Sequence, residues 1–278
     1  MIVALGVFIL SFDALLVRLA GTSAFNVVFW RGLFTFTSLA LLLVLGGAAA
    51  RLTLRPIWGL SLAGLVAGAG LVLFPLSITH TETANTVVIL TAAPFFAALF
   101  SRLFLKERIA ARTWIAILVV AIGIATIFSG SLSTDGRFGD VIALIAAINF
   151  GINMTILRAM PGISRIAVTC LSGIVACLIC APFATPLGLP TESLGWLALS
   201  GLLQMPAAMV LISIGTRFLP APEVSLLLLI ETLLAPVWVY LVFTEAPSEA
   251  TIYGGAMILI TLFVHSWLGL RNRERAGR

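Results

Sequence analysis

Charged side chains are scarce in this sequence. Only 10% of its 278 residues are Asp, Glu, Lys or Arg, whereas soluble domains carry roughly 25%. Hydrophobic residues make up 61% of the chain, and its mean hydropathy is +1.18. So few charges cannot cover the surface of a soluble domain of this size, which excludes an ordinary soluble enzyme. The composition predicts an integral membrane protein made mostly of spanning helices.

Residues that carry out chemistry are also few. The two histidines, His80 and His265, lie far apart in the sequence, and the three cysteines all fall in one apolar stretch. The sequence has no HExxH motif, no aspartyl pair, no serine–histidine–acid set and no Walker-type GxxxxGK[ST]. We therefore expect no metal, no cofactor and no direct hydrolysis of ATP. A membrane-embedded enzyme without a recognisable motif stays open as the alternative class.

Ten apolar stretches are long enough to cross a bilayer, because about 20 helical residues span its hydrocarbon core. The sequence therefore predicts an all-α fold of ten transmembrane helices. The short connections leave little chain for a soluble domain. The predicted spans cover residues 2–20, 25–46, 57–78, 84–104, 112–129, 138–158, 164–186, 194–216, 221–243 and 250–270.

The basic residues favour one orientation of these spans. If the N-terminus is cytoplasmic, most of the 16 Lys and Arg residues fall in inside segments, as the positive-inside rule predicts. We therefore expect cytoplasmic N- and C-termini in a bacterial inner membrane. The tail RNRERAGR is interpreted as a basic anchor at the lipid surface, so no nucleic acid is expected as a partner.

The sequence contains a weak internal repeat. The stretch TVVILTAAPFFAALFSRLFLKER (86–108) aligns without gaps with VSLLLLIETLLAPVWVYLVFTEA (224–246). Glu107 then falls on Glu245, each at the end of a long apolar helix, and Ala93 falls on Glu231. Similarity that recurs in the same order in both halves of a chain indicates a duplicated fold.

The repeat divides the chain into residues 1–130 and 131–278, with five spans in each half and the basic tail in the second. Near the start of each half, SFDALLVRLA (11–20) set against GINMTILRAM (151–160) places Asp13 opposite Asn153. An odd number of spans per half makes the second copy run in the opposite sense across the membrane. Inverted repeats are typical of secondary transporters, whose solute site lies near the midplane where the halves meet.

The ends of the fourth and ninth spans, PFFAALFSRLFLKER and ETLLAPVWVYLVFTE, resemble those of the drug/metabolite transporter superfamily in its EamA-type branch. In that family the repeat ends in an apolar helix followed by a Gly-Glu-Arg-like turn. Lys106-Glu107-Arg108 matches this turn except that Lys106 replaces the glycine, and Thr244-Glu245 is a looser match. The resemblance implies a ten-helix bundle that moves small organic solutes by alternating access. It also implies a cavity lined mainly by spans 1, 3, 4, 6, 8 and 9.

Asp13 and Arg31 are the first candidate pair of charges. At 1.5 Å per residue, both lie about 10–12 Å below the outer ends of the first and second spans. They can therefore meet between adjacent helices. One interpretation is an ion pair that fastens the two helices. The other is a solute-binding or proton-titrating pair, because ionisable groups inside a membrane are functional candidates.

Glu231 is predicted near the bilayer centre, about 18 Å below the outer end of the ninth span. No basic residue of the sequence is predicted at that depth. Desolvation without a partner favours the neutral acid. Glu231 is then either a protonated side chain bonded to a neighbouring helix or part of an aqueous cavity, where it meets a cationic group or a coupling proton. Trp238, two turns along the same helix face, offers an organic cation an aromatic ring.

Further polar residues are predicted to share this cavity, because amides and imidazoles bind carboxylates and amines: Asn85, Asn149, Asn153, Gln204 and His80. The alternative for the amides is that they join neighbouring transmembrane helices. Residues that bend helices or allow close approach are predicted as hinges: Gly68, Pro94, Pro206 and Pro236.

Together these patterns predict a secondary transporter that exports small organic solutes, most of all amino acids, including large apolar or aromatic ones. The export of cationic drugs or toxic compounds is the alternative within the same class. The expected partners are the solute and the lipid bilayer. Whether protons take part and how many copies assemble are left open by the sequence.

Overall fold

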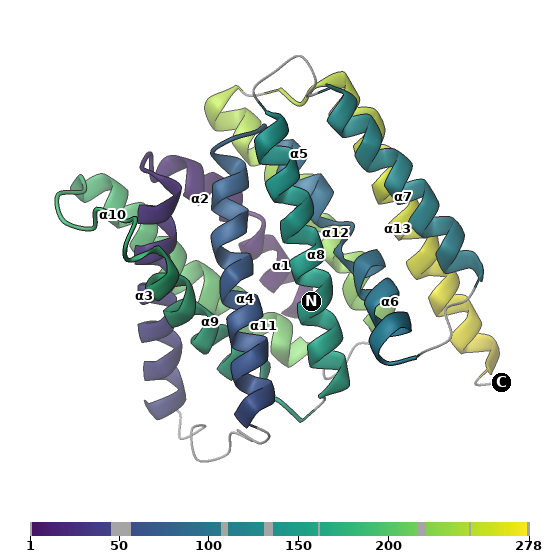
Figure 1. The fold of residues 1–278 in the computed structure, drawn as a ribbon, viewed down its shortest axis with the longest axis horizontal. Coiled ribbons are helices and arrows are strands. Elements are labelled where there is room, and N and C mark those ends of the chain that lie inside the picture. The colour runs from purple at the N-terminus through teal and green to yellow at the C-terminus, as the bar shows by residue number, and fades with distance from the viewer. Residues whose placement is uncertain are drawn as a thin grey trace.

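The fold is described here from a computed structural model, which covers residues 2–45, 57–106, 111–130, 136–160, 162–215, 221–244 and 246–276. Every regular element in this described part is a helix (Figure 1). The first half contains α1 (Ile2–Leu10), α2 (Asp13–Leu19), α3 (Ala24–Leu45), α4 (Ile57–Ile78), α5 (Thr83–Leu90), α6 (Ala93–Phe104) and α7 (Ala111–Gly130). The second half contains α8 (Arg137–Ala159), α9 (Arg165–Cys180), α10 (Thr191–Ala198), the π-helical segment η3 (Leu199–Gln204), α11 (Met205–Gly215), α12 (Ala221–Phe243) and α13 (Glu249–Ala276).

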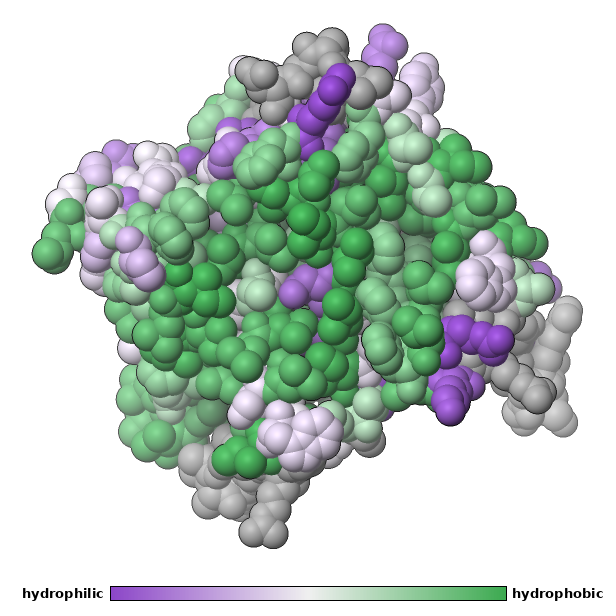
Figure 2. Space-filling view, in the orientation of Figure 1, coloured by the Kyte–Doolittle hydropathy of each residue, from purple (hydrophilic) through white to green (hydrophobic). Residues whose placement is uncertain are grey.

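Most of these helices are long and apolar enough to cross a membrane. Among the described residues there are eight such segments, and two shorter apolar helices, Arg165–Cys180 and Ile230–Phe243, lie in the remaining predicted spans. Figure 2 shows a broad apolar surface with hydrophilic residues gathered toward its ends. The predicted span 164–186 is too long, because α9 ends at Cys180. Pro182 lies two residues beyond this end, and proline disfavours further helix.

The first span is interrupted between α1 and α2, at Ser11 and Phe12. The Phe12 N–H donates to the Ile9 carbonyl, three residues back, over 3.4 Å. This break leaves carbonyls at the end of α1 without their usual partners four residues on. In a membrane such groups must be satisfied from elsewhere in the protein.

The fourth span is interrupted between α5 and α6, at Thr91 and Ala92. The Thr91 N–H donates to the Val88 carbonyl over 3.1 Å, and the Thr91 hydroxyl bonds the same oxygen over 2.6 Å. Pro94 lies in the first turn of α6, where its missing N–H removes no helical hydrogen bond. The predicted hinge Pro94 therefore lies at a real break in the helix.

The eighth span changes its winding instead of breaking. The π-helical segment η3 runs from Leu199 to Gln204, directly before the predicted hinge Pro206. Proline cannot donate to the carbonyl four residues earlier, which belongs to Leu202. The Ser38 hydroxyl of α3 donates to this carbonyl over 2.9 Å. The Ser38 side chain of the second span therefore supplies the hydrogen bond to the Leu202 carbonyl that Pro206 cannot donate.

Glycines bring two pairs of helices into close contact. A methyl group added at Gly32 of α3 would lie 2.5 Å from the Gly173 carbonyl of α9, and one added at Gly173 would lie 2.7 Å from the Gly32 carbonyl. Gly123 of α7 and Gly254 of α13 are related in the same reciprocal way, at 2.9 and 2.5 Å. The second and seventh spans thus pack together as the fifth and tenth do, and α7 and α13 run side by side at one edge of the bundle (Figure 1).

The other large helix contacts also occur in related pairs. The first span packs against the eighth through α1 and α11, and the third packs against the sixth through α4 and α8. The fourth span contacts the sixth through α6 and α8, and the ninth contacts the first through α12 and α1. In each of these two pairs, one contact between the halves becomes the other when each span is replaced by the span five places away.

Two helix ends share an unusual backbone conformation. Lys106, after α6, and Thr244, after α12, have φ angles of 55° and 54°, and they are the non-glycine residues with positive φ in the described part of the chain. Left-handed residues at this place end many helices, and glycine is preferred there. Lys106 and Thr244 align with each other in the internal repeat. Glu107 and Glu245, which follow them, lie outside the described residues.

Candidate functional site

The first element of the site is a buried ion pair between Asp13 and Arg31. Asp13 begins α2 immediately after the break in the first span. One guanidinium nitrogen of Arg31 lies 2.8 Å from one oxygen of Asp13 and 2.7 Å from the other. The two residues are only 6% and 5% exposed. Removing one partner from such a pair leaves an uncompensated charge and costs about 3–5 kcal/mol.

Gln204 satisfies the carbonyls that the break in the first span leaves open. Its side-chain Nε2 donates to the Ile9 carbonyl over 3.2 Å and to the Leu10 carbonyl over 3.3 Å. Only the NH₂ group of an amide can donate, so these contacts fix which end of the amide faces the break. The Oε1 atom of Gln204 is buried and has no hydrogen-bond partner in the described part of the chain.

Trp238 closes the other side of the same break. Its indole N–H donates to the Ser11 hydroxyl over 2.9 Å, and Ser11 donates to the Phe8 carbonyl over 2.7 Å. The indole ring also stacks on Phe12, with the ring centroids 4.8 Å apart and the planes 12° apart. One face of Trp238 is thus already covered by Phe12, and the indole holds the break in place.

Glu231 lies two turns before Trp238 on α12, the helix that packs against α1, α2 and α5. Its side chain is half-buried. Among the described residues it makes no hydrogen bond and no ion pair. Its helix packs against α2, whose first residue is Asp13. With Asp13, Arg31 and an ionised Glu231, the site carries one net negative charge.

This arrangement suits a solute that carries positive charge. The Arg31 guanidinium is engaged by Asp13, which leaves the Glu231 carboxylate to be neutralised by another group. Two carboxylates that share a site rarely both stay ionised unless cations balance them. A cationic group of a solute or a proton can supply that balance. The structure therefore brings five of the predicted residues together around the break in the first span: Asp13, Arg31, Glu231, Gln204 and Trp238.

Asn85 belongs to a different polar cluster, at the start of the fourth span. Its Nδ2 atom donates to the buried Asp140 carboxylate over 3.0 Å, and the Thr251 hydroxyl donates to its Oδ1 atom. The Thr81 hydroxyl bonds the same Asp140 oxygen over 2.6 Å. Glu82 accepts from the Ser248 N–H over 3.0 Å. This cluster joins the beginnings of α5, α8 and α13 at one end of the bundle, apart from the break.

The other predicted polar residues are spread over the bundle. Asn153 donates to the Ala63 carbonyl over 2.9 Å and so joins α8 to α4. Asn149, on the same helix, lies against Gly70 of α4, and its buried Oδ1 atom has no hydrogen-bond partner among the described residues. His80 is exposed at the end of the third span, where its Nδ1 lies 2.8 Å from the Leu76 carbonyl.

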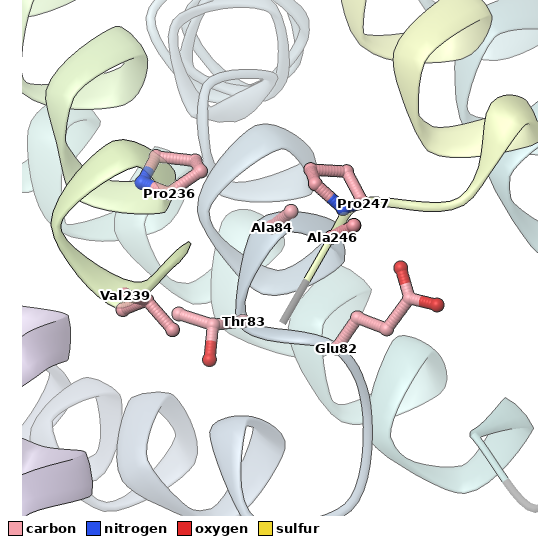
Figure 3. A pocket seen from close by; sticks show the side chains of 7 residues that line it. All are labelled: Glu82, Thr83, Ala84, Pro236, Val239, Ala246 and Pro247. Atoms are coloured by element: carbon pink, nitrogen blue, oxygen red, sulfur yellow. The ribbon is translucent and has the colours of Figure 1, made fainter. Parts of the chain in front are cut away.

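The remaining predicted hinges lie inside continuous helices. Gly68 is buried in α4, where an added methyl group would meet Val175 of α9 at 2.5 Å. Pro236 lies within α12. It also lines a small pocket at the ends of α5 and α12, with Glu82, Thr83, Ala84, Val239, Ala246 and Pro247. In Figure 3 Pro236 and Val239 face α5 from α12, and the Glu82 carboxylate points away from them. Glu231 does not line this pocket.

A family model supplies the decisive comparison. The model described as the EamA-like transporter family matches residues 1–129 and 137–267, which together are most of the chain. The chain belongs to the EamA-like transporter family. Membership makes it a membrane-embedded transporter of small solutes rather than an enzyme.

This EamA-like transporter also resembles individual proteins. A curated relative from Rickettsia felis (strain ATCC VR-1525 / URRWXCal2), an S-adenosylmethionine uptake transporter, is 26% identical over 250 residues, which cover 87% of this chain and 82% of that protein. A solved chain described as "Crystal structure of protein" superposes with a TM-score of 0.66, covers 96% of both chains and is 17% identical. The solved structure supports the fold alone.

The sequence patterns missed three residues of interest in this EamA-like transporter. Ser11 is fully buried at the first break, and Asp140 is fully buried in the cluster around Asn85. Ser200 is buried in η3, and its hydroxyl has no partner in the described part of the chain. Asp140 could have been recognised from the sequence, because it is an acidic residue in the first turn of a predicted spanning helix. Serine is too common in apolar helices to mark Ser11 or Ser200.

Proposed function

We propose that this transporter carries solutes built on an α-amino acid that also bear a further positive charge, with S-adenosylmethionine as the first candidate. The single observation that carries the proposal is the half-buried Glu231 carboxylate, which has no partner among the described residues and stands on α12, the helix that packs against α2 with its buried Asp13–Arg31 pair. The name of the Rickettsia felis relative supports the choice of solute.

The charges of this solute complement those of the proposed site. S-adenosylmethionine has an ammonium group, a sulfonium group and a carboxylate, so it carries one net positive charge. The site carries one net negative charge when Glu231 is ionised. A buried charge is tolerated when it is paired, so binding of the solute would remove the cost of keeping Glu231 ionised. A proton would do the same in the absence of solute, which makes Glu231 the residue through which protons can couple to transport.

We propose alternating access between two inverted five-helix repeats as the mechanism, with residues 1–130 and 131–278 as the two units. Three observations support it: the two separate matches to the family model, the helix contacts that recur five spans apart, and the aligned positive φ angles of Lys106 and Thr244. Inverted repeats place the solute site between the halves. The distribution of Lys and Arg supports cytoplasmic termini in an inner membrane.

The second candidate function is the export of amino acids, including large apolar or aromatic ones, or of cationic toxic compounds. The aromatic group formed by Phe8, Phe12 and Trp238 favours it, because Phe8 and Phe12 both pack on the indole beside the break. A flat or apolar solute can contact these rings in the way that they contact each other.

The test is exchange of radiolabelled S-adenosylmethionine in proteoliposomes, with wild type beside Glu231→Gln. We expect the wild type to exchange the label against unlabelled solute, and Glu231→Gln to lose at least about tenfold of that rate, since the loss of a charged hydrogen bond costs about 1.5–3 kcal/mol. Glu192→Gln, at an exposed glutamate in the first turn of α10, is the matched control and should exchange like wild type.

Two outcomes would count against this choice of solute. Normal exchange of S-adenosylmethionine by Glu231→Gln would remove the proposed role of the carboxylate. Exchange of phenylalanine without exchange of S-adenosylmethionine by the wild type would replace the first candidate with the second.

A further inference from the structure

The π-helical segment of the eighth span carries two buried polar atoms that bond to nothing in the described residues. The Ser200 hydroxyl and the Gln204 Oε1 atom have no hydrogen-bond partner in the described part of the chain, and their residues are 2% and 6% exposed. A buried polar atom without a partner costs about 1–3 kcal/mol. Two of them within one turn of helix indicate a place where another molecule supplies the missing bonds.

Both side chains lie on one side of their helix. Residues four positions apart share a helix face, and Gln204 of this pair faces the break in the first span, where it holds the Ile9 and Leu10 carbonyls. Ser200 therefore lies on the side of η3 that is turned toward α1 and α2. The segment η3 does contact α2.

The buried ion pair is close to the same segment. Gly201, between the two polar residues, lies so near α3 that an added methyl group would meet the Arg31 carbonyl at 2.9 Å. The side chain of Arg31 in turn reaches Asp13 at the start of α2. The two unsatisfied atoms thus adjoin a helix break and a buried pair of charges. Discontinuous helices and π-helical segments both occur often at binding sites.

We propose that Ser200 and Gln204 form the subsite that holds the α-amino acid group of the solute. The Gln204 Oε1 atom accepts a hydrogen bond from the ammonium group, and the Ser200 hydroxyl donates one to the carboxylate. This inference rests on the proposed function and adds to it the residues that recognise the amino acid part. The additional positive charge of the solute is left to Glu231.

The chemistry of the two atoms supports this division of roles. A carboxamide oxygen only accepts hydrogen bonds, so it suits an ammonium group and repels a carboxylate. A serine hydroxyl can donate, and a hydrogen bond to a charged carboxylate is stronger than one to a neutral acceptor. The Gln204 amide cannot exchange its two ends without losing both bonds to the first span.

The experiment compares the binding of two ligands by purified full-length protein. One ligand is S-adenosylmethionine, and the other is its decarboxylated form, which keeps the ammonium and sulfonium groups. We expect Ser200→Ala to weaken the binding of S-adenosylmethionine about tenfold and to leave the binding of the decarboxylated ligand unchanged. Gln204→Met should weaken both ligands, because both carry the ammonium group.

Two serine variants serve as controls. Ser101→Ala removes another buried hydroxyl, in α6, that has no partner among the residues the structure describes. Ser38→Ala removes the hydrogen bond from α3 to Leu202 of η3. Both should keep the wild-type ratio between the two ligands. If Ser101→Ala or Ser38→Ala changed that ratio as much as Ser200→Ala, a general effect of packing would replace the proposed contact.

The remaining outcomes separate the subsite from the proposed function. If the wild type binds S-adenosylmethionine but Ser200→Ala weakens both ligands equally, or neither, the subsite is wrong and the proposed function stands. If the wild type binds neither ligand, both proposals are wrong. The ratio between ligands is measured on folded protein, so a loss of yield in Gln204→Met does not affect the result for Ser200→Ala.

Discussion

The two halves of this transporter agree in how their helices pack and differ in how their helices are interrupted. In the first half both the first and the fourth span are broken, at Ser11–Phe12 and at Thr91–Ala92. Their counterparts in the second half, α8 and α12, run without a break, and the change of winding falls in the eighth span instead. The two halves therefore share which helices pack together, but the breaks and the π-helical segment lie in different spans in each half.

The charged residues follow the same division. Asp13 stands beside a break and pairs with Arg31, whereas Asn153, at the aligned position, lies inside a continuous helix and joins it to the Ala63 carbonyl. Glu231 aligns with Ala93, which has no charge. The symmetry in helix packing therefore does not extend to the positions of the charged side chains. The first, second and ninth spans bring Asp13, Arg31 and Glu231 to a single break, whereas the buried Asp140 of the sixth span belongs to the separate cluster around Asn85.

The largest expected effect is on the ion pair. Asp13→Asn leaves the Arg31 charge buried without its partner, so we expect a loss of about 3–5 kcal/mol of stability. Asn153→Ala at the aligned position should cost only about 1 kcal/mol, because one neutral hydrogen bond is lost. Thermal unfolding in detergent measures both. The double variant Asp13→Leu with Arg31→Met should recover stability, since it removes both charges.

Recovery of stability without recovery of transport in that double variant would assign the pair to the site. Recovery of both stability and transport would show that the ion pair only stabilises the contact between α2 and α3. Equal losses for Asp13→Asn and Asn153→Ala would contradict the difference between the halves.

A smaller effect is expected at the reciprocal glycine contacts. Gly173→Leu forces a side chain into the backbone of α3, and Gly254→Leu does the same to α7, so each should cost up to about 3 kcal/mol. Gly195→Leu is the control, because in the described part of the chain no neighbour outside its own stretch of helix lies within 4 Å of a methyl group added there. Unfolding temperatures and the yield of monodisperse protein test this. If one of the two glycine variants were tolerated and the other were not, the two helix pairs would not be equivalent.

The smallest effect is expected at the two helix ends with positive φ. Lys106→Gly and Thr244→Gly should each stabilise the protein by up to about 1 kcal/mol, because glycine adopts this conformation without the cost that a side chain adds. The unfolding temperature measures the change, and Gly188→Ala, at a residue with a φ of 97°, should shift it in the opposite direction. Unequal shifts for Lys106→Gly and Thr244→Gly would indicate that the two turns differ.

Hydropathy located the apolar helices, because each span needs a long apolar stretch to cross a bilayer, and eight helices of the described residues meet that requirement. It extended the seventh span past Cys180, where α9 ends. The breaks were harder to predict. Pro94 and Pro206 mark the irregular positions in the fourth and eighth spans. The break in the first span falls at Ser11 and Phe12, neither of which is a proline or a glycine. The first break persists because Gln204 and Trp238, which are distant in sequence, satisfy it. Only the folded structure shows such partners.

The candidate site was partly predictable for a similar reason. Depth along the helices was sufficient to pair Asp13 with Arg31, because adjacent spans of known direction have comparable depths. Depth says nothing about which face of a helix a side chain occupies, so Asn85 and His80 were grouped with residues from which the structure separates them. Asn85 instead faces Asp140 and Thr251.

The amide of Gln204 has one more consequence, for how the first span can move. It attaches the end of α1 to the eighth span, and the Asp13–Arg31 pair attaches the start of α2 to the second span. Both pieces of the first span also pack against α12 and the eighth span, and they meet at Ser11 and Phe12, where the Phe12 N–H reaches the Ile9 carbonyl over 3.4 Å. Any shift of α12 or of the eighth span therefore reaches the break in the first span directly, through the Trp238 indole on one side and the Gln204 amide on the other.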